Sequence, residues 1–208
     1  MHKALEPGHF HHWEPEQAYH GSKLGMWIFL ATEVHLFSAV FCVFGVFRFK
    51  YLEDFDHYAR TLNWKLGLLN TAVLLTSSYF MVRAVDAAQK GLNKKIIKWC
   101  DLANFCGLIF MVVKTIEYSS KFSHGITPAT NIFYGLYFTA TGIHGLHVLI
   151  GMGLIYWLRV LAKKERFSVK YYTPVEVVGL YWHLVDVVWI YVFPVFYLLG
   201  GISLGGAH

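Results

Sequence analysis

Three ionisable side chains stand within one long apolar segment near the end of the chain. Glu176, His183 and Asp186 lie between Pro174 and Pro194, where most other residues are Val, Leu, Tyr, Trp, Ile or Phe. At helical spacing the three side chains fall on one stripe of a helix. Ionisable groups inside a bilayer are costly and must face protein, water or a partner. The stripe therefore predicts an interior polar surface. Its candidate roles are an ion path, a set of ligands, or a hydrogen-bonded seam between helices.

A single carboxylate, Glu33, lies nine or ten residues into the first apolar run. At about 1.5 Å per residue, this depth is near the middle of a bilayer. Two interpretations are open from the residue alone. Glu33 is either a carboxylate that exchanges protons or a hydrogen-bonded packing residue between helices.

Two histidines, His144 and His147, stand three residues apart near the middle of another apolar run. This spacing puts both on one face of a helix, as in helical haem or metal sites. The alternative is hydrogen bonding across a helix interface, where Gly142, Gly145 and Gly151 would permit close approach of the backbones. Ligands from other helices could complete a metal site, so the residues leave ligation open while favouring the structural role.

The elements that must position these side chains are five apolar runs, each near or above the spanning length of about 20 residues. They cover approximately residues 24–47, 66–88, 97–117, 130–160 and 174–200, after a polar N-terminal tail at 1–23. Only 15% of the residues are charged, whereas soluble domains average about 25%. The sequence therefore predicts an all-α membrane bundle that forms one domain over residues 1–208. Lys114 and Glu117, at the end of the third run, are expected to extend to the membrane interface.

The basic residues are divided unevenly between the two sets of loops. The N-terminal tail and the loops after the second and fourth runs carry twelve Lys and Arg residues, and the remaining loops carry six. The positive-inside rule places the N-terminus in the cytoplasm and the C-terminus outside. Because the basic residues are confined to short loops, nothing favours nucleic-acid binding.

The remaining motifs are weak. Cys42, Cys100 and Cys106 form no CxxC or haem-attachment motif and are expected to be small apolar residues in or beside the helices. The His-rich stretch at residues 9–12 is expected to be a solvated segment. Pro194 predicts a kink near the outer end of the last helix, and Tyr197 is expected in an aromatic belt at the membrane interface.

Three segments, in order, resemble subunit III of the haem–copper respiratory oxidases. The first, Leu24-Gly-Met-Trp-Ile-Phe-Leu-Ala-Thr-Glu-Val-His-Leu-Phe, resembles that family's first core helix, with Glu33 at the place of its carbodiimide-reactive glutamate. The second is Thr139-Ala-Thr-Gly-Ile-His-Gly-Leu-His-Val-Leu-Ile-Gly, and the third is Tyr181-Trp-His-Leu-Val-Asp-Val-Val-Trp. The resemblance runs from about residue 20 to 200 and is to the short bacterial form, which has five spans in place of seven.

The resemblance implies an accessory subunit without a redox centre, in an inner-membrane complex that reduces dioxygen to water and pumps protons in aerobic respiration. Haem and copper would belong to subunits I and II, so this chain would bind neither. It would pack mainly beside subunit I, support proton uptake through Glu33 and protect the catalytic subunit. It would also hold phospholipid in a cleft between the first pair of helices and the rest, with Arg159 contacting headgroups.

The resemblance also implies a role for the buried polar residues. They would form a structural polar seam that fixes the helices against one another. Its members would be His144, His147, Glu176, His183 and Asp186.

Two other functions stay open beside this one. The chain could be the subunit III-like component of a quinol oxidase or of a nitric oxide reductase, which would share the fold. It could also be an independent haem- or metal-binding membrane protein that uses His144, His147 and His183. One departure bears on the lipid contact: Tyr171 and Tyr172 stand where many members of the family have a pair of histidines.

Overall fold

The computed structural model describes residues 15–199, and the His-rich stretch at 9–12 lies outside them. The helices are α1 (Pro15–Lys50), α2 (Leu52–Arg60), α3 (Trp64–Gln89), α4 (Asn93–Ser123), α5 (Ile132–Lys163) and α6 (Thr173–Phe193), followed by the π-helical turn η1 (Pro194–Leu198). Five helices, α1, α3, α4, α5 and α6 with η1, are long and apolar enough to cross a membrane. The predicted all-α bundle with five spans is confirmed.

Side-chain hydrogen bonds and a glycine determine where several of the helices begin and end. The side chain of Asn63 accepts hydrogen bonds from the backbone amides of Lys65 and Leu66 at the start of α3. Asn131 caps α5 in the same way through the amide of Tyr134, at 2.8 Å. Such caps satisfy backbone donors that a helix start leaves free. Gly91, with φ of +66°, provides the left-handed residue that allows the tight turn between α3 and α4.

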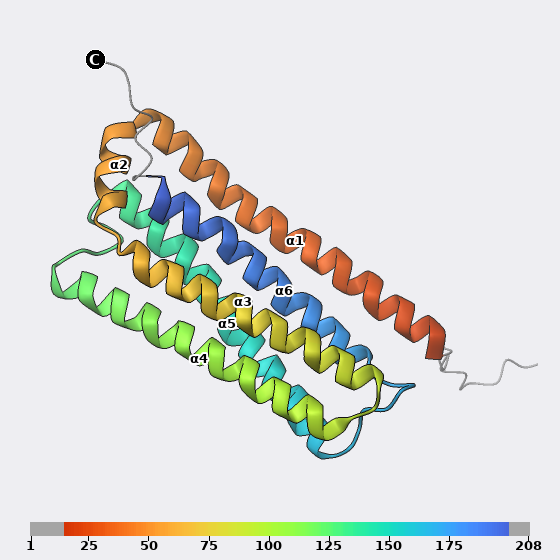
Figure 1. The fold of residues 1–208 in the computed structure, drawn as a ribbon. Helices are drawn as coiled ribbons and strands as arrows, with labels where there is room; N and C mark the ends of the chain where they lie inside the picture. Colours follow the sequence, from red (N-terminus) through yellow and green to blue (C-terminus); the bar gives the residue numbers. More distant parts are fainter. Residues whose placement is uncertain (1–14, 200–208) are drawn as a thin grey trace, which may run out of the picture.

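The helices run side by side in an elongated bundle (Figure 1). α3 packs along α4, α6 packs against α3 and α5, and α1 lies against α6 and α5. The short helix α2 folds across one end of the bundle, where it buries Phe55 and Ala59. The opposite end, at which α1, α4 and α6 begin and α3 and α5 end, is called the basic end here because its loops carry the larger share of Lys and Arg.

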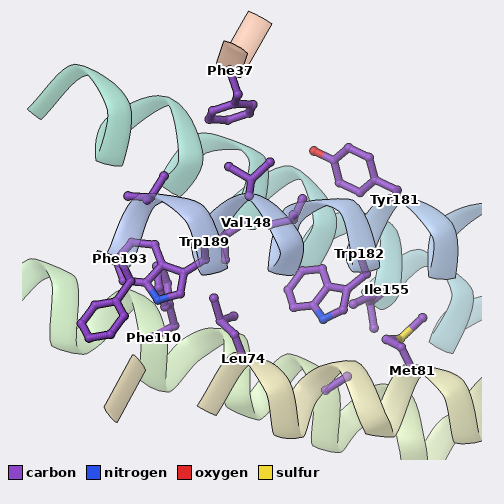
Figure 2. Packing of buried hydrophobic residues seen from close by; sticks show 14 of the residues in the cluster. Phe37, Leu74, Met81, Phe110, Val148, Ile155, Tyr181, Trp182, Trp189 and Phe193 are labelled. Atoms are coloured by element: carbon purple, nitrogen blue, oxygen red, sulfur yellow. The ribbon is translucent and has the colours of Figure 1, made fainter. Parts of the chain in front are cut away.

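Large aromatic side chains fill the centre of the bundle (Figure 2). Trp182 and Trp189 of α6 are fully buried. Their ring N–H groups donate to Ser77 at 3.0 Å and to Thr71 at 3.1 Å, both in α3. Buried indoles usually find such an acceptor, so these two bonds attach α6 to α3 in the apolar interior.

Close helix packing depends on fewer glycines than the sequence suggested. A Cβ atom at Gly151 would lie 2.6 Å from the ring of Trp182, so this position requires glycine. A Cβ at Gly142 or Gly145 would meet nothing within 4 Å. The prediction that all three glycines permit close approach was therefore wrong for Gly142 and Gly145, which face away from the neighbouring helices.

The last span changes its helical form near its end. At Pro194 the α-helix gives way to η1, where the amide of Leu199 donates to the carbonyl of Pro194 at 3.2 Å. Tyr197, in this turn, is only 4% exposed. The placement of Tyr197 in an aromatic belt was wrong because its hydroxyl group bonds inside the bundle, as described below.

Candidate functional site

Glu33 and His147 meet between α1 and α5. The Oε2 atom of Glu33 lies 2.9 Å from Nε2 of His147, and the two side chains are 14% and 13% exposed. His147 Nδ1 lies 2.8 Å from the carbonyl oxygen of Ile143. A carbonyl can only accept, so Nδ1 carries a hydrogen. A hydrogen bond then joins Nε2 to the carboxyl oxygen of Glu33, with the hydrogen carried by one of the two groups.

Aromatic rings hold this pair in place. The ring of Phe37 meets His147 edge-on, with centroids 5.4 Å apart. The ring of Tyr181 lies nearly parallel to the imidazole, and its hydroxyl donates to the backbone carbonyl of His147 at 3.1 Å. These contacts fix the orientation of the imidazole toward Glu33.

Glu33 and His147 lie on the wall of a cleft between α1 and the pair α5–α6, with a volume of about 1190 Å³. We call it the α1 cleft. Its lining is largely apolar and aromatic, and the polar residues other than Glu33 and His147 lie toward the basic end. The lining comprises Tyr19, Ser22, Met26, Phe29, Glu33, His147, Ile150, Leu154, Trp157, Val169, Lys170, Tyr171, Tyr172, Thr173, Pro174, Val177, Val178 and Tyr181. At the basic end of the α1 cleft, a hydrogen bond with the neighbouring Tyr19 raises the pKa of Tyr172.

His144 does not join His147, although both stand on α5. It is fully buried, and its ring packs edge-on against Phe110 and beside Trp189, with centroids 5.4 and 5.1 Å apart. Over the described part of the chain, neither ring nitrogen of His144 has a hydrogen-bond partner. Residues 15–199 also contain no group of three or more His, Cys, Asp or Glu side chains arranged to hold a metal ion. The two histidines therefore face different surroundings and do not converge on a common ligand position.

The polar stripe of α6 contacts two different helices. Near the basic end, Glu176 pairs with Lys23 of α1 at 3.2 Å and accepts a hydrogen bond from the hydroxyl of Tyr19 at 3.1 Å. Deeper, His183 Nδ1 lies 2.7 Å from the hydroxyl of Ser78 on α3. The stripe thus connects α6 to α1 at its start and to α3 further in, as expected of an interior polar surface.

Asp186, one helical turn beyond His183, is 3% exposed. Its carboxyl group lies beside Ser78. Among residues 15–199, however, neither of its oxygens has a hydrogen-bond partner within bonding geometry. The structure therefore places this carboxyl group in the interior without the ion pair that usually accompanies a buried charge.

A buried charge cluster in α4 was not predicted. Lys114 and Glu117 have side chains only 7% and 5% exposed and pair at 3.0 Å. The hydroxyls of Tyr137 and Tyr197 lie 3.1 and 2.9 Å from the ammonium group and donate to Glu117 at 2.9 and 2.7 Å. The expectation that Lys114 and Glu117 extend to the interface was wrong, because their face of α4 packs inward on α5 and η1. The i, i+3, i+7 spacing of Lys114, Glu117 and Lys121 was the available signal.

Arg159, the predicted lipid contact, pairs with Asp101 of α4. Neither residue lines the α1 cleft. A headgroup at Arg159 would therefore lie outside this cleft, and the lipid role of Arg159 stays a prediction.

These features define a polytopic helical membrane protein with a lateral apolar cleft and an interior built around hydrogen-bonded polar side chains. The model of the cytochrome c oxidase subunit III family matches residues 6–201. The chain therefore belongs to the subunit III family of the haem–copper oxidases.

Curated relatives agree in length and name. A probable quinol oxidase subunit 3 of Staphylococcus haemolyticus (strain JCSC1435) is 32% identical over 190 residues, covering 88% of this chain and 92% of that protein. A probable cytochrome c oxidase subunit 3 of Nocardia farcinica (strain IFM 10152) is 30% identical over 176 residues, covering 85% and 87%. The quinol oxidase subunit 3 of Bacillus subtilis (strain 168) is 32% identical over 187 residues, covering 88% of each chain.

Proposed function

We propose that this chain is an accessory subunit, without a redox centre, that sustains proton uptake by the catalytic part of a proton-pumping respiratory oxidase. Family membership implies other oxidase subunits as partners. The observation that carries the proposal is the contact of 2.9 Å between Oε2 of Glu33 and Nε2 of His147 on the wall of the α1 cleft. A partly exposed carboxylate–imidazole pair can exchange protons with groups or water at the cleft, so it can hold a proton close to a neighbouring uptake path.

The α1 cleft is the proposed phospholipid site. It separates α1 from α5 and α6 and not, as expected, the first pair of helices from the rest, because α3 packs along α4 and α6. Its apolar lining fits acyl chains, and Lys170, Tyr19 and Tyr172 at the basic end fit a headgroup at the membrane interface. Lipid that fills this cleft would attach α1 to the bundle and exclude water from the apolar face of the pair. In this proposed role the lipid stabilises the complex and takes part in no reaction.

The partners in this proposal are subunits I and II, with subunit I the main contact, in a bacterial cytoplasmic membrane. The N-terminus is proposed to face the cytoplasm because the basic end carries most of the Lys and Arg residues. Relatives include subunits of both quinol and cytochrome c oxidases. Co-purification of the catalytic subunits in mild detergent would identify the complex and its electron donor.

Glu33→Gln tests the role of the Glu33–His147 pair. The amide retains a hydrogen bond to His147 but cannot exchange a proton, so we expect normal assembly, slower proton uptake and severalfold fewer turnovers before half of the activity is lost. The measurements are oxygen consumption over repeated turnovers and proton uptake in reconstituted vesicles.

Glu53→Gln on the exposed surface of α2 is the matched control and should behave as the parent complex. An assembled Glu33→Gln complex with unchanged turnover lifetime and proton uptake would refute the proposal.

A further inference from the structure

A second cavity, which we call the inlet, lies between α1, α3 and α6 at the basic end and has a volume of about 400 Å³. Its wall includes Lys23 of α1, Asp86 and Gln89 of α3, and Glu176 and His183 of α6. Within the described residues, the inlet and the α1 cleft share no lining residue. The inlet is therefore a separate cavity on the other side of α1 from Glu33 and His147, and its wall combines these polar groups with apolar side chains such as Trp27 and Leu180.

The charged groups of the inlet are concentrated at its mouth. Glu176 pairs with Lys23, and Asp86 pairs with Lys90 at 2.6 Å. His183 lies further in, seven residues along α6 from Glu176, which corresponds to about 10 Å along a helix. The volume is large enough for several water molecules, and Lys23, Glu176 and His183 give them polar partners along one wall.

Beyond the inlet, exchangeable groups continue to Asp186. His183 Nδ1 lies 2.7 Å from the hydroxyl of Ser78, and Ser78 lies beside the carboxyl group of Asp186. The two carboxyl oxygens are buried without hydrogen-bond partners in the part of the chain that the structure describes. A buried polar group without a protein partner is commonly satisfied by an internal water molecule, and water needs a polar site of this kind.

We propose that the inlet is a hydrated proton-exchange path that ends at Asp186. The ligand is water, and the Asp186 carboxyl group exchanges its proton with the solution at the basic end through His183 and Ser78. A neutral imidazole accepts a proton at one ring nitrogen while it releases one from the other. The hydroxyl of Ser78 likewise accepts one proton and donates another, so neither His183 nor Ser78 keeps a charge after the proton has passed. Because this path does not use Glu33 or His147, it can fail while the proposed function holds, and the reverse is also true.

Cysteine accessibility tests the hydration of the inlet in the complete oxidase complex. Cys42, Cys100 and Cys106 are first replaced by alanine, and His183→Cys is then exposed to a small charged methanethiosulfonate in sealed vesicles of either orientation. We expect modification of the new thiol only when the basic end faces the reagent. Val112→Cys, on the exposed apolar face of α4, is the control and should react from neither side. Failure of the His183→Cys thiol to react from the basic end would overturn the proposal.

Infrared spectroscopy tests proton exchange at Asp186 itself. A carboxyl C=O band that disappears in Asp186→Asn should shift in D₂O at once in the parent complex. Val82→Trp, which places an indole in the lining of the inlet, should slow that shift by an order of magnitude, whereas Val112→Trp should not. An ionised Asp186, or an exchange rate unchanged by Val82→Trp, contradicts the path. If Asp186→Asn does not assemble, the cysteine result decides.

Discussion

Four side chains, Lys114, Glu117, Tyr137 and Tyr197, form a hydrogen-bonded cluster in the half of the bundle away from the basic end. The ammonium group of Lys114 contacts Glu117 and two tyrosine hydroxyls, and it also lies 5.3 Å from the centre of the Trp189 ring. Taking two charges out of water costs several kcal/mol per ion, and only good geometry with additional hydrogen bonds compensates for it. Here Tyr137 and Tyr197 provide those bonds, so the cluster is tolerated only while all four members are present.

Lys114→Met should therefore destabilise the chain strongly. It leaves Glu117 buried without its cation, and breaking a buried pair in this way costs about 3–5 kcal/mol. The measurement is the free energy of unfolding in detergent, or the melting temperature of the chain in its complex. The double variant Lys114→Met/Glu117→Leu should recover much of the loss, because the carboxylate that lost its cation is removed as well, while Lys121 keeps its contacts with the rings of Tyr134 and Tyr137.

Lys65→Met, at an exposed lysine, is the control for loss of a positive charge and should change stability little. Equal losses in the single and the double variant would contradict the dependence of Glu117 on Lys114.

At the scale of elements, the contact between α5 and α6 depends on one glycine. The rigid ring of Trp182 occupies the space that a side chain at Gly151 would need. Trp182 is fixed from its other side by its bond to Ser77 of α3. It cannot move away from α5 without breaking that bond, so α3, α5 and α6 are packed as one unit at this depth.

Gly151→Ala should destabilise the bundle by about 1–3 kcal/mol, as overpacking of a filled core usually does. Gly153→Ala, two residues further along the same helix, meets nothing within 4 Å. That control should be neutral or stabilising by up to about 1 kcal/mol, because alanine favours a helix over glycine. Melting curves of both variants give the comparison, and the same sign of effect in both would refute the packing argument.

At the scale of the whole molecule, α1 is attached more loosely than the other spans. Over the described residues, its contacts with the long helices are mainly with α6 and α5, and large apolar side chains such as Trp27, Ile28 and Val46 remain exposed along it. The α1 cleft further separates it from α5 and α6 over the half nearer the basic end. The proposed lipid in the cleft would supply the contacts that protein does not, so the assembled state would depend on lipid.

Leu154→Trp should reduce the phospholipid that co-purifies with the complex, because an indole at this position occupies the α1 cleft. Phosphorus analysis or native mass spectrometry of the purified complex measures the bound lipid. Leu68→Trp, on the exposed face of α3, is the matched control and should leave the lipid content unchanged. Equal lipid content in both variants would show that the cleft is not a lipid site.

Several elements could be predicted because their signals are local in the sequence. Each apolar run is long enough to cross a bilayer by itself, and its depth scale follows from a fixed rise per residue. On that scale Glu33 is predicted to lie far from either membrane surface. The segments around His144 and around His183 likewise indicated the family without knowledge of the fold, because their residue types and spacing resemble motifs of that family.

What the sequence by itself determined was therefore the helical class, the number of spans, the family and the position of each polar group along its helix. Only the tertiary structure decided which way each group faces: Glu33 toward His147, more than a hundred residues away, and Lys114 and Glu117 toward Tyr137 and Tyr197 instead of the membrane interface. The physical reason is that depth follows from position along one helix, whereas rotation about the helix axis is set by packing against several others. In an apolar chain, where exposed and buried faces are equally hydrophobic, periodicity carries little information about that rotation.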